Sequence, residues 1–155
     1  MPHRIPAAPA AWLLFALVVG LLWSVSEVGG APMLAPTPDT VADAYYTAGL
    51  EEKAARRFAA AVANFHRAVE GRPAFPEAWS ELGFALRQTG SYADALRAYE
   101  QALKLRPNFP EALEYLGELY AKLGRLDDAR AVLERLKPLD AARAQELDEA
   151  IRSAR

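Results

Sequence analysis

The chain has 155 residues, with 18 basic and 20 acidic side chains and a formal net charge of −2 at pH 7. This length allows one domain and a short additional segment. A charge so close to neutral argues against nucleic-acid binding, which usually needs a clustered basic surface. The chain contains no cysteine, which excludes disulfides, thiolate metal sites and a thiol nucleophile but fits any cellular compartment.

The first segment of the chain is strongly apolar. Arg4 is the last basic or acidic residue before Glu27, and the run Ala11–Trp23 contains no polar side chain. A helix over residues 6–28 would be long enough to span a bilayer, which needs about 20 apolar residues. A cleaved signal peptide over residues 1–28 is the alternative, because a basic start followed by an apolar stretch also fits that pattern. We favour the transmembrane anchor because the apolar run is long for a signal peptide.

The charges around this segment predict its orientation. Arg4 precedes it, whereas Glu27 and Asp39 follow it, and basic flanks stay on the cytoplasmic side of a membrane. We therefore expect a single-pass inner-membrane protein whose remaining chain is periplasmic, or a soluble periplasmic protein after signal cleavage. The composition, rich in alanine and arginine, suggests a bacterial source. Residues 29–39, rich in proline and glycine, are predicted to form an extended linker.

From residue 40 onward the sequence repeats with a fixed period of about 34 residues. A fixed period of this length predicts a stack of helix pairs. Asp39 and Thr40 are predicted to cap the first helix, and Gly83 and Ala95 to face each other within the second pair. Glycine at the turns tolerates left-handed backbone. The repeated positions are Pro76 and Pro110, Leu82 and Leu116, Gly83 and Gly117, Gly90 and Gly124, and Ala95 and Ala129.

The stretch from Pro76 to Pro107 resembles the tetratricopeptide repeat at almost every signature position, and residues 110–139 are a second good match. A weaker copy at 42–75 has Arg56 in place of the turn glycine. The last copy is short, because Pro138 arrives early. The resemblance implies an all-α solenoid of about three helix-turn-helix repeats within residues 40–139, at about 42–75, 76–109 and 110–139. Residues 140–155 are predicted to form a capping helix, and residues 6–28 an apolar N-terminal helix.

The resemblance also implies an inner groove, lined by the first helix of each pair, that binds other proteins. The best-known ligands of this family are peptide tails whose carboxylates are held by lysine, asparagine and arginine. The matching positions here hold none of these residue types, which argues against such tails; they are Tyr46, Leu50, Glu81, Glu111 and Tyr115. The full set of predicted groove residues is Tyr46, Leu50, Glu77, Glu81, Phe84, Arg87, Glu111, Glu114, Tyr115 and Glu118.

This groove combines glutamates with aromatic and aliphatic side chains. It predicts a partner segment that carries lysine or arginine beside apolar anchors. The alternative interpretation is that Glu111, Glu114 and Glu118 form an ordinary solvated helix face. Replacing all three with lysine is expected to abolish partner binding without unfolding the domain.

The sequence predicts no catalytic, cofactor-binding or metal-binding residue and no small-molecule substrate. The chain has two histidines, His3 at the start of the N-terminal apolar segment and His66 on a predicted helix surface. No glycine-rich phosphate loop or metal-ligand spacing is present. We therefore expect a non-enzymatic scaffold: a membrane-tethered adapter that recruits or assembles extracytoplasmic proteins. An accessory structural subunit of a larger membrane complex, or a released periplasmic binding module, stays open.

Overall fold

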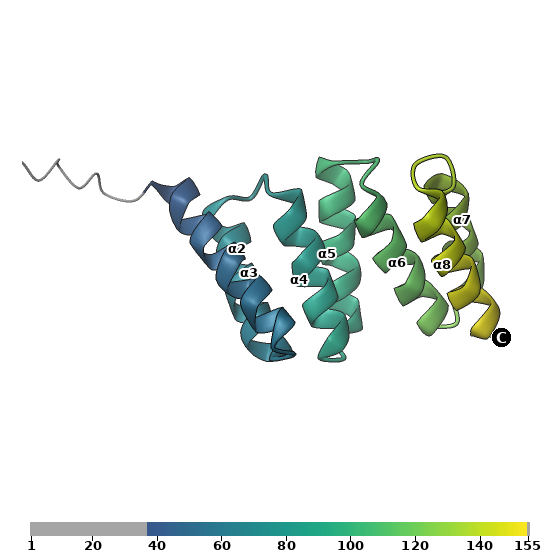
Figure 1. The fold of residues 1–155 in the computed structure, drawn as a ribbon, viewed down its shortest axis with the longest axis horizontal. Coiled ribbons are helices and arrows are strands. Elements are labelled where there is room, and N and C mark those ends of the chain that lie inside the picture. The colour runs from purple at the N-terminus through teal and green to yellow at the C-terminus, as the bar shows by residue number, and fades with distance from the viewer. Residues whose placement is uncertain (1–36, 155) are drawn as a thin grey trace, which may run out of the picture. The chain divides into compact units, whose positions relative to one another are not determined.

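The computed structural model describes residues 37–154, and within them the chain forms helices and no strand (Figure 1). The predicted apolar helix at 6–28 and nearly all of the predicted linker lie outside these residues. Of the helices that are described, none is both long and apolar enough to cross a membrane. The helices are α2 (Pro38–Ala54), α3 (Phe58–Gly71), α4 (Pro76–Gln88), α5 (Tyr92–Leu105), α6 (Pro110–Lys122), α7 (Leu126–Leu136) and α8 (Ala141–Ser153).

These helices pack as consecutive pairs, α2 with α3, α4 with α5 and α6 with α7, and α8 closes the stack against both α6 and α7. The first helices α4 and α6 approach one another, and the closing helix α8 approaches α6 in the same way. No comparable packing joins α3 to α5 or α5 to α7. The first helices therefore line an inner face, and the second helices lie on the outer face. This arrangement confirms the predicted all-α repeat stack.

Two helix ends show how local sequence sets the boundaries. α2 begins at Pro38, before the predicted cap at Asp39 and Thr40, because the Thr37 hydroxyl oxygen accepts a hydrogen bond from the Thr40 backbone N–H at 3.3 Å. Proline fits the first helical position, since its missing N–H would have no partner there. Pro38 therefore belongs to the repeat domain and not to the linker. α7 ends at Leu136, as expected from the early Pro138.

The turns inside the helix pairs use left-handed backbone. Gly90 and Gly124 have φ angles of +85° and +73°, as their residue type predicts. The first pair makes the same turn with Arg56 at φ +57°, although a side chain is strained in this region. Arg56 is exposed, so little packing offsets that strain.

We expect Arg56→Gly to raise the free energy of unfolding by about 1 kcal/mol, because it removes the strain of left-handed backbone at a non-glycine residue. Gly90→Ala is the matched opposite change. No atom lies within 4 Å of a Cβ built on Gly90. Gly90→Ala is therefore expected to lower the free energy of unfolding by about 1 kcal/mol through backbone strain alone. Denaturant titration of both variants checks this. A lower midpoint for Arg56→Gly would contradict it.

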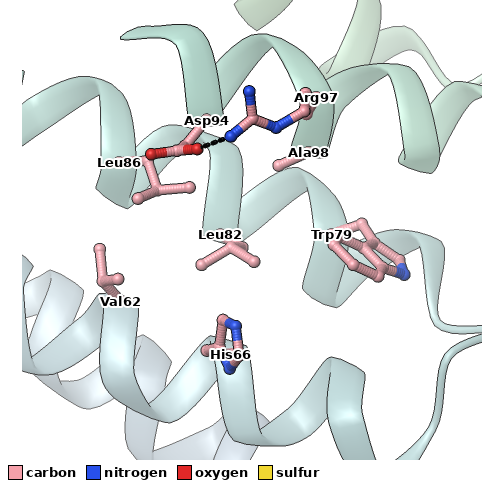
Figure 2. Close-up of a pocket in the computed structure, with 8 residues that line it drawn as sticks. All are labelled: Val62, His66, Trp79, Leu82, Leu86, Asp94, Arg97 and Ala98. Atoms are coloured by element: carbon pink, nitrogen blue, oxygen red, sulfur yellow. Dashed lines mark hydrogen bonds and ion pairs between the residues drawn. The ribbon is translucent and has the colours of Figure 1, made fainter. Parts of the chain in front are cut away.

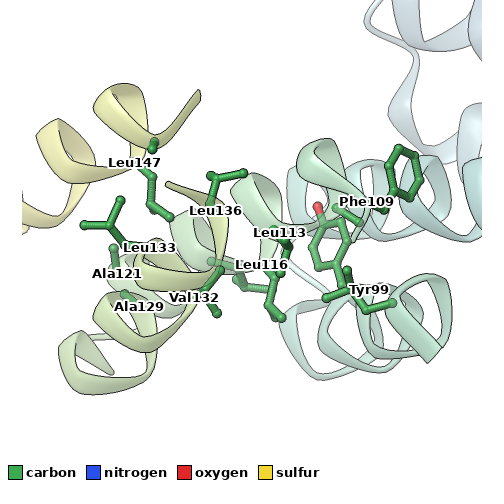
Figure 3. Packing of buried hydrophobic residues seen from close by; sticks show 14 of the residues in the cluster. Tyr99, Phe109, Leu113, Leu116, Ala121, Ala129, Val132, Leu133, Leu136 and Leu147 are labelled. Atoms are coloured by element: carbon green, nitrogen blue, oxygen red, sulfur yellow. The ribbon is translucent and has the colours of Figure 1, made fainter. Parts of the chain in front are cut away.

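Buried aromatic rings pack closely against glycines within the pairs. A Cβ built on Gly83 would lie 2.6 Å from Cε1 of Tyr99, so the ring of Tyr99 occupies the space that a side chain at Gly83 would need. Gly49 meets the Phe65 ring in the same way. Tyr99 also belongs to the core cluster that continues through α6 and α7 to Leu147 of α8 (Figure 3). This continuity confirms that α8 caps the stack.

Candidate protein-binding face

The predicted groove residues all lie on α2, α4 and α6, the helices that line the inner face. Their exposure is uneven. Glu81 and Glu114 are buried, with 6% and 4% of their surface exposed, and the other predicted groove residues are half-buried. The inner face is therefore not a uniform row of solvated carboxylates, and the three glutamates of α6 have different environments.

Ion pairs cross each seam between neighbouring first helices. The Lys53 ammonium donates to both carboxylate oxygens of Glu81, at 2.6 and 2.7 Å. Because these contacts join separate repeats, they fix the spacing of the inner face. The pairs are Lys53–Glu81 from α2 to α4, Arg87–Glu118 from α4 to α6 at 2.5 Å, and Glu114–Arg143 from α6 to α8.

Two cations of these pairs, Lys53 and Arg143, were missing from the predicted groove. Lys53 had a sequence signal, because it precedes Arg87 by one repeat period. Arg143 had none, because it lies on α8, outside the three repeats.

Half-buried aromatic residues lie at the centre of the inner face. The ring centroid of Phe84 is 5.2 Å from that of Tyr115 and 6.2 Å from that of Phe58. The Lys53 ammonium is 5.0 Å from the Phe84 centroid, and the Arg87 guanidinium is 5.3 Å from Phe84 and 5.6 Å from Tyr115. Cations at such distances are attracted to the ring face. This surface therefore already holds cations of its own chain over aromatic rings.

Burial also sets the titration of two inner-face carboxyls. Burial raises the pKa of Glu81 above its ordinary value, although the hydrogen bond and charge of Lys53 oppose the rise. Burial likewise raises the pKa of Glu114; Arg143 opposes the rise and the neighbouring Glu146 adds to it. In neutral solution, keeping each of these carboxylates ionised in its buried position therefore lowers the free energy of unfolding.

A carboxyl whose pKa is higher in the folded state stabilises the fold below its unfolded pKa, about 4.3 for glutamate. That stabilisation is lost as pH rises through the folded pKa. We expect the free energy of unfolding of Glu81→Gln to fall less than that of the wild type between about pH 4 and pH 7. Urea denaturation across this range gives the slope of the free energy of unfolding against pH, with Glu118→Gln as the matched control. Equal slopes for the wild type and Glu81→Gln would contradict this prediction.

The outer face carries two hollows at equivalent positions of successive repeats. One, of about 370 Å³, lies between α3, α4 and α5, with Leu82, Asp94 and Ala98 among its lining residues (Figure 2). The other, of about 420 Å³, is lined by Leu116, Asp128 and Val132, each at the equivalent position of the next repeat. They thus recur where the second helix of one repeat faces both helices of the next repeat. Within residues 37–154, no cluster of histidine, aspartate and glutamate side chains is suited to hold a metal ion.

The sequence of these repeats matches a known protein family. The tetratricopeptide repeat model matches residues 46–96 and 81–144, which together span more than half of the chain. The chain belongs to the tetratricopeptide repeat family. Tetratricopeptide repeat domains are generally protein-binding modules without enzymatic activity. Among curated proteins, none matches the chain.

Solved structures share the fold at low sequence identity. The TPR2B-domain:pHsp70 complex of yeast Sti1 is 20% identical, with a TM-score of 0.68 and coverage of 73% of this chain and 94% of that chain. The first TPR of Spaghetti (RPAP3) bound to the HSP90 peptide SRMEEVD is 17% identical, with a TM-score of 0.69 and coverage of 76% of this chain and 96% of that chain. The Arabidopsis OM64 TPR domain is 14% identical, with a TM-score of 0.71 and coverage of 75% of this chain and 98% of that chain. At these identities the similarity shows the fold alone.

Proposed function

We propose that this chain is a non-enzymatic scaffold that binds another protein through the inner face of its repeat stack. The observation that carries the proposal is the pair of half-buried rings, Phe84 and Tyr115, at the centre of that face. Lys53 and Arg87, the cations of two seam ion pairs, lie over these rings and restrict them before a partner binds. Preplaced aromatic side chains are the residues on which protein partners most often anchor.

The proposed partner is not a peptide held by its terminal carboxylates. The inner-face cations at the seams each bind a glutamate of a neighbouring first helix. An incoming carboxylate would have to displace one of those glutamates, of which Glu81 and Glu114 are buried. This chemistry differs from recognition of an acidic tail, so the peptides bound in two of the similar structures are poor guides to the ligand here.

We also propose that residues 6–28 tether this scaffold to a membrane, with the repeats on the extracytoplasmic side. The apolar run, the basic residue before it and the acidic residues after it support this placement. The small residues Ala16, Gly20 and Ser24, spaced four apart along the apolar run, favour a second function, as an accessory subunit of a larger membrane complex. A periplasmic binding module released by signal cleavage is the remaining alternative.

The test uses native membranes solubilised in mild detergent. The full chain is purified with its bound proteins, which mass spectrometry identifies, in parallel with Phe84→Ala and Leu105→Ala variants. Leu105 lies at the end of α5 with 37% of its surface exposed, so it controls for the loss of an exposed apolar side chain. We expect a partner protein to co-purify with the wild type and with Leu105→Ala, and to be lost with Phe84→Ala.

The outcomes separate the alternatives. A partner that Phe84→Ala retains would exclude the inner face as the binding surface. Integral membrane proteins recovered in fixed stoichiometry would identify a complex subunit, whereas substoichiometric recovery would favour an adapter. Peptide mapping settles the tether: recovery of residues 6–28 supports the anchor, and a mature chain that begins near Glu27 supports a released module.

A further inference from the structure

A carboxylate–arginine pair recurs at one edge of the inner face. The Arg72 guanidinium, just after α3, donates to Asp43 of α2 at 2.6 Å. The Arg106 guanidinium, just after α5, donates to Glu77 of α4. Both members of the second pair follow those of the first by one repeat period, so this is a feature of the repeat. It neutralises this carboxylate on α2 and on α4.

Glu111 is the third carboxylate of this series, and its basic partner is displaced. The residue that corresponds to Arg72 and Arg106, directly before the proline after the second helix, is Lys137. At the two arginines the backbone leaves the helix, with φ and ψ of −137° and 87°, and −136° and 89°. Lys137 stays helical, at −47° and −48°, and its ammonium binds Glu134 at 2.6 Å. Within residues 37–154, Glu111 therefore forms no ion pair.

Glu111 has an aromatic neighbour on its own helix. Tyr115 follows it by one helical turn on α6, so the two side chains share a face. Burial raises the pKa of the Tyr115 hydroxyl, and Glu111 and Glu81 add to the rise. The same causes, burial first, raise the pKa of Tyr46 on α2 to about 12. These directions agree with a negative potential between α2 and α6.

The other glutamates on this face are already neutralised. Each binds a lysine or arginine of the chain, so a partner's cation would gain little from them. Arg143 lies near enough to Glu111 to be influenced by it, but its guanidinium donates to Glu114. Glu111 is therefore the inner-face carboxylate with unused capacity to accept a charged hydrogen bond. The neutralised set is Glu77, Glu81, Glu114 and Glu118.

We propose that Glu111, with Tyr115 one helical turn away on α6, accepts a lysine or arginine side chain of the partner protein, and that an apolar neighbour of this cation packs on Phe84. This inference rests on the proposed inner-face function and specifies the class of segment that is bound. A carboxylate supplies a charge-assisted hydrogen bond and the rings attract the cation. The contact of Lys53 with Phe84 shows the same chemistry within the chain.

The test measures binding of two synthetic nonapeptides to the detergent-solubilised full chain by fluorescence anisotropy. Both have the sequence Gly-Ser-Phe-Leu-X-Leu-Phe-Ser-Gly, with lysine or glutamine at X. We expect the lysine peptide to bind the wild type about tenfold more tightly at low salt, a preference that salt weakens. Glu111→Gln is expected to reduce this preference to about twofold or less. Glu100→Gln, which removes an exposed charge from α5 on the outer face, should keep it.

Each outcome decides the proposal. An equal loss of preference in Glu111→Gln and Glu100→Gln would show a general charge effect and overturn the cation site. If Phe84→Ala abolishes binding of both peptides while Glu111→Gln keeps the lysine preference, the inner face binds peptides but the cation site is wrong. If neither peptide binds the wild type at millimolar concentration, the inner-face function itself is overturned.

Discussion

Replacing Gly83 with alanine is expected to lower the free energy of unfolding by about 2 kcal/mol. The added Cβ would lie 2.6 Å from Cε1 and 2.7 Å from Cδ1 of Tyr99, a ring with no exposed surface. The ring is enclosed by the core, so α4 and α5 must move apart to admit the methyl group. The higher helix propensity of alanine raises the free energy of unfolding by at most about 1 kcal/mol, which is less than the clash is expected to remove.

Gly117 provides the matched control for this effect. A Cβ there would lie 2.5 Å from Cδ2 of Leu147, at the end of a flexible side chain on the closing helix α8. Leu147 is also fully buried, but its methyl groups can shift by rotation about the side-chain bonds, which the rigid Tyr99 ring cannot do, so Gly117→Ala should cost about 1 kcal/mol or less. Denaturant titration gives both values. Equal losses for the two variants would contradict the clash with Tyr99, whereas partial rescue of Gly83→Ala by Tyr99→Leu would support it.

The fold could be predicted from the sequence because its determinants are local and periodic. Glycine at positions 90 and 124, one repeat period apart, signals left-handed turns wherever it occurs at the end of an amphipathic stretch. The early Pro138 likewise predicts a short α7. The start of α2 was misplaced because two nearby threonines offered competing caps, and the structure uses Thr37 with Pro38.

The candidate site was only partly predictable. The predicted groove residues lie on α2, α4 and α6, but helical phase gave no information about which charges would meet. Lys53 reaches Glu81 across 28 residues, and Arg143 reaches Glu114 across 29. Such pairs depend on how neighbouring helices pack. The shortened third repeat shifts this packing further.

This pairing changes what the three glutamates of α6 are expected to do on mutation. Glu114→Lys should lower the free energy of unfolding by about 3 kcal/mol, because it removes the Glu114–Arg143 pair and places a second cation beside Arg143 in a buried position. Glu111→Lys should change stability by about 0.5 kcal/mol or less, since Glu111 is half-buried and has no ion pair within residues 37–154. The triple lysine variant is therefore expected to destabilise the fold, contrary to the sequence-based expectation.

Urea denaturation of Glu111→Lys, Glu114→Lys and the charge-swapped double variant Glu114→Lys with Arg143→Glu checks this ordering. The swap restores opposite charges across the seam between α6 and α8, so it should recover part of the lost stability. Equal stability of Glu111→Lys and Glu114→Lys would mean that the Glu114–Arg143 pair adds nothing to the docking of α8. If the ordering holds, Glu111→Lys is the variant that changes the charge of the proposed cation site in a folded protein, and Glu114→Lys reports the closure of the stack.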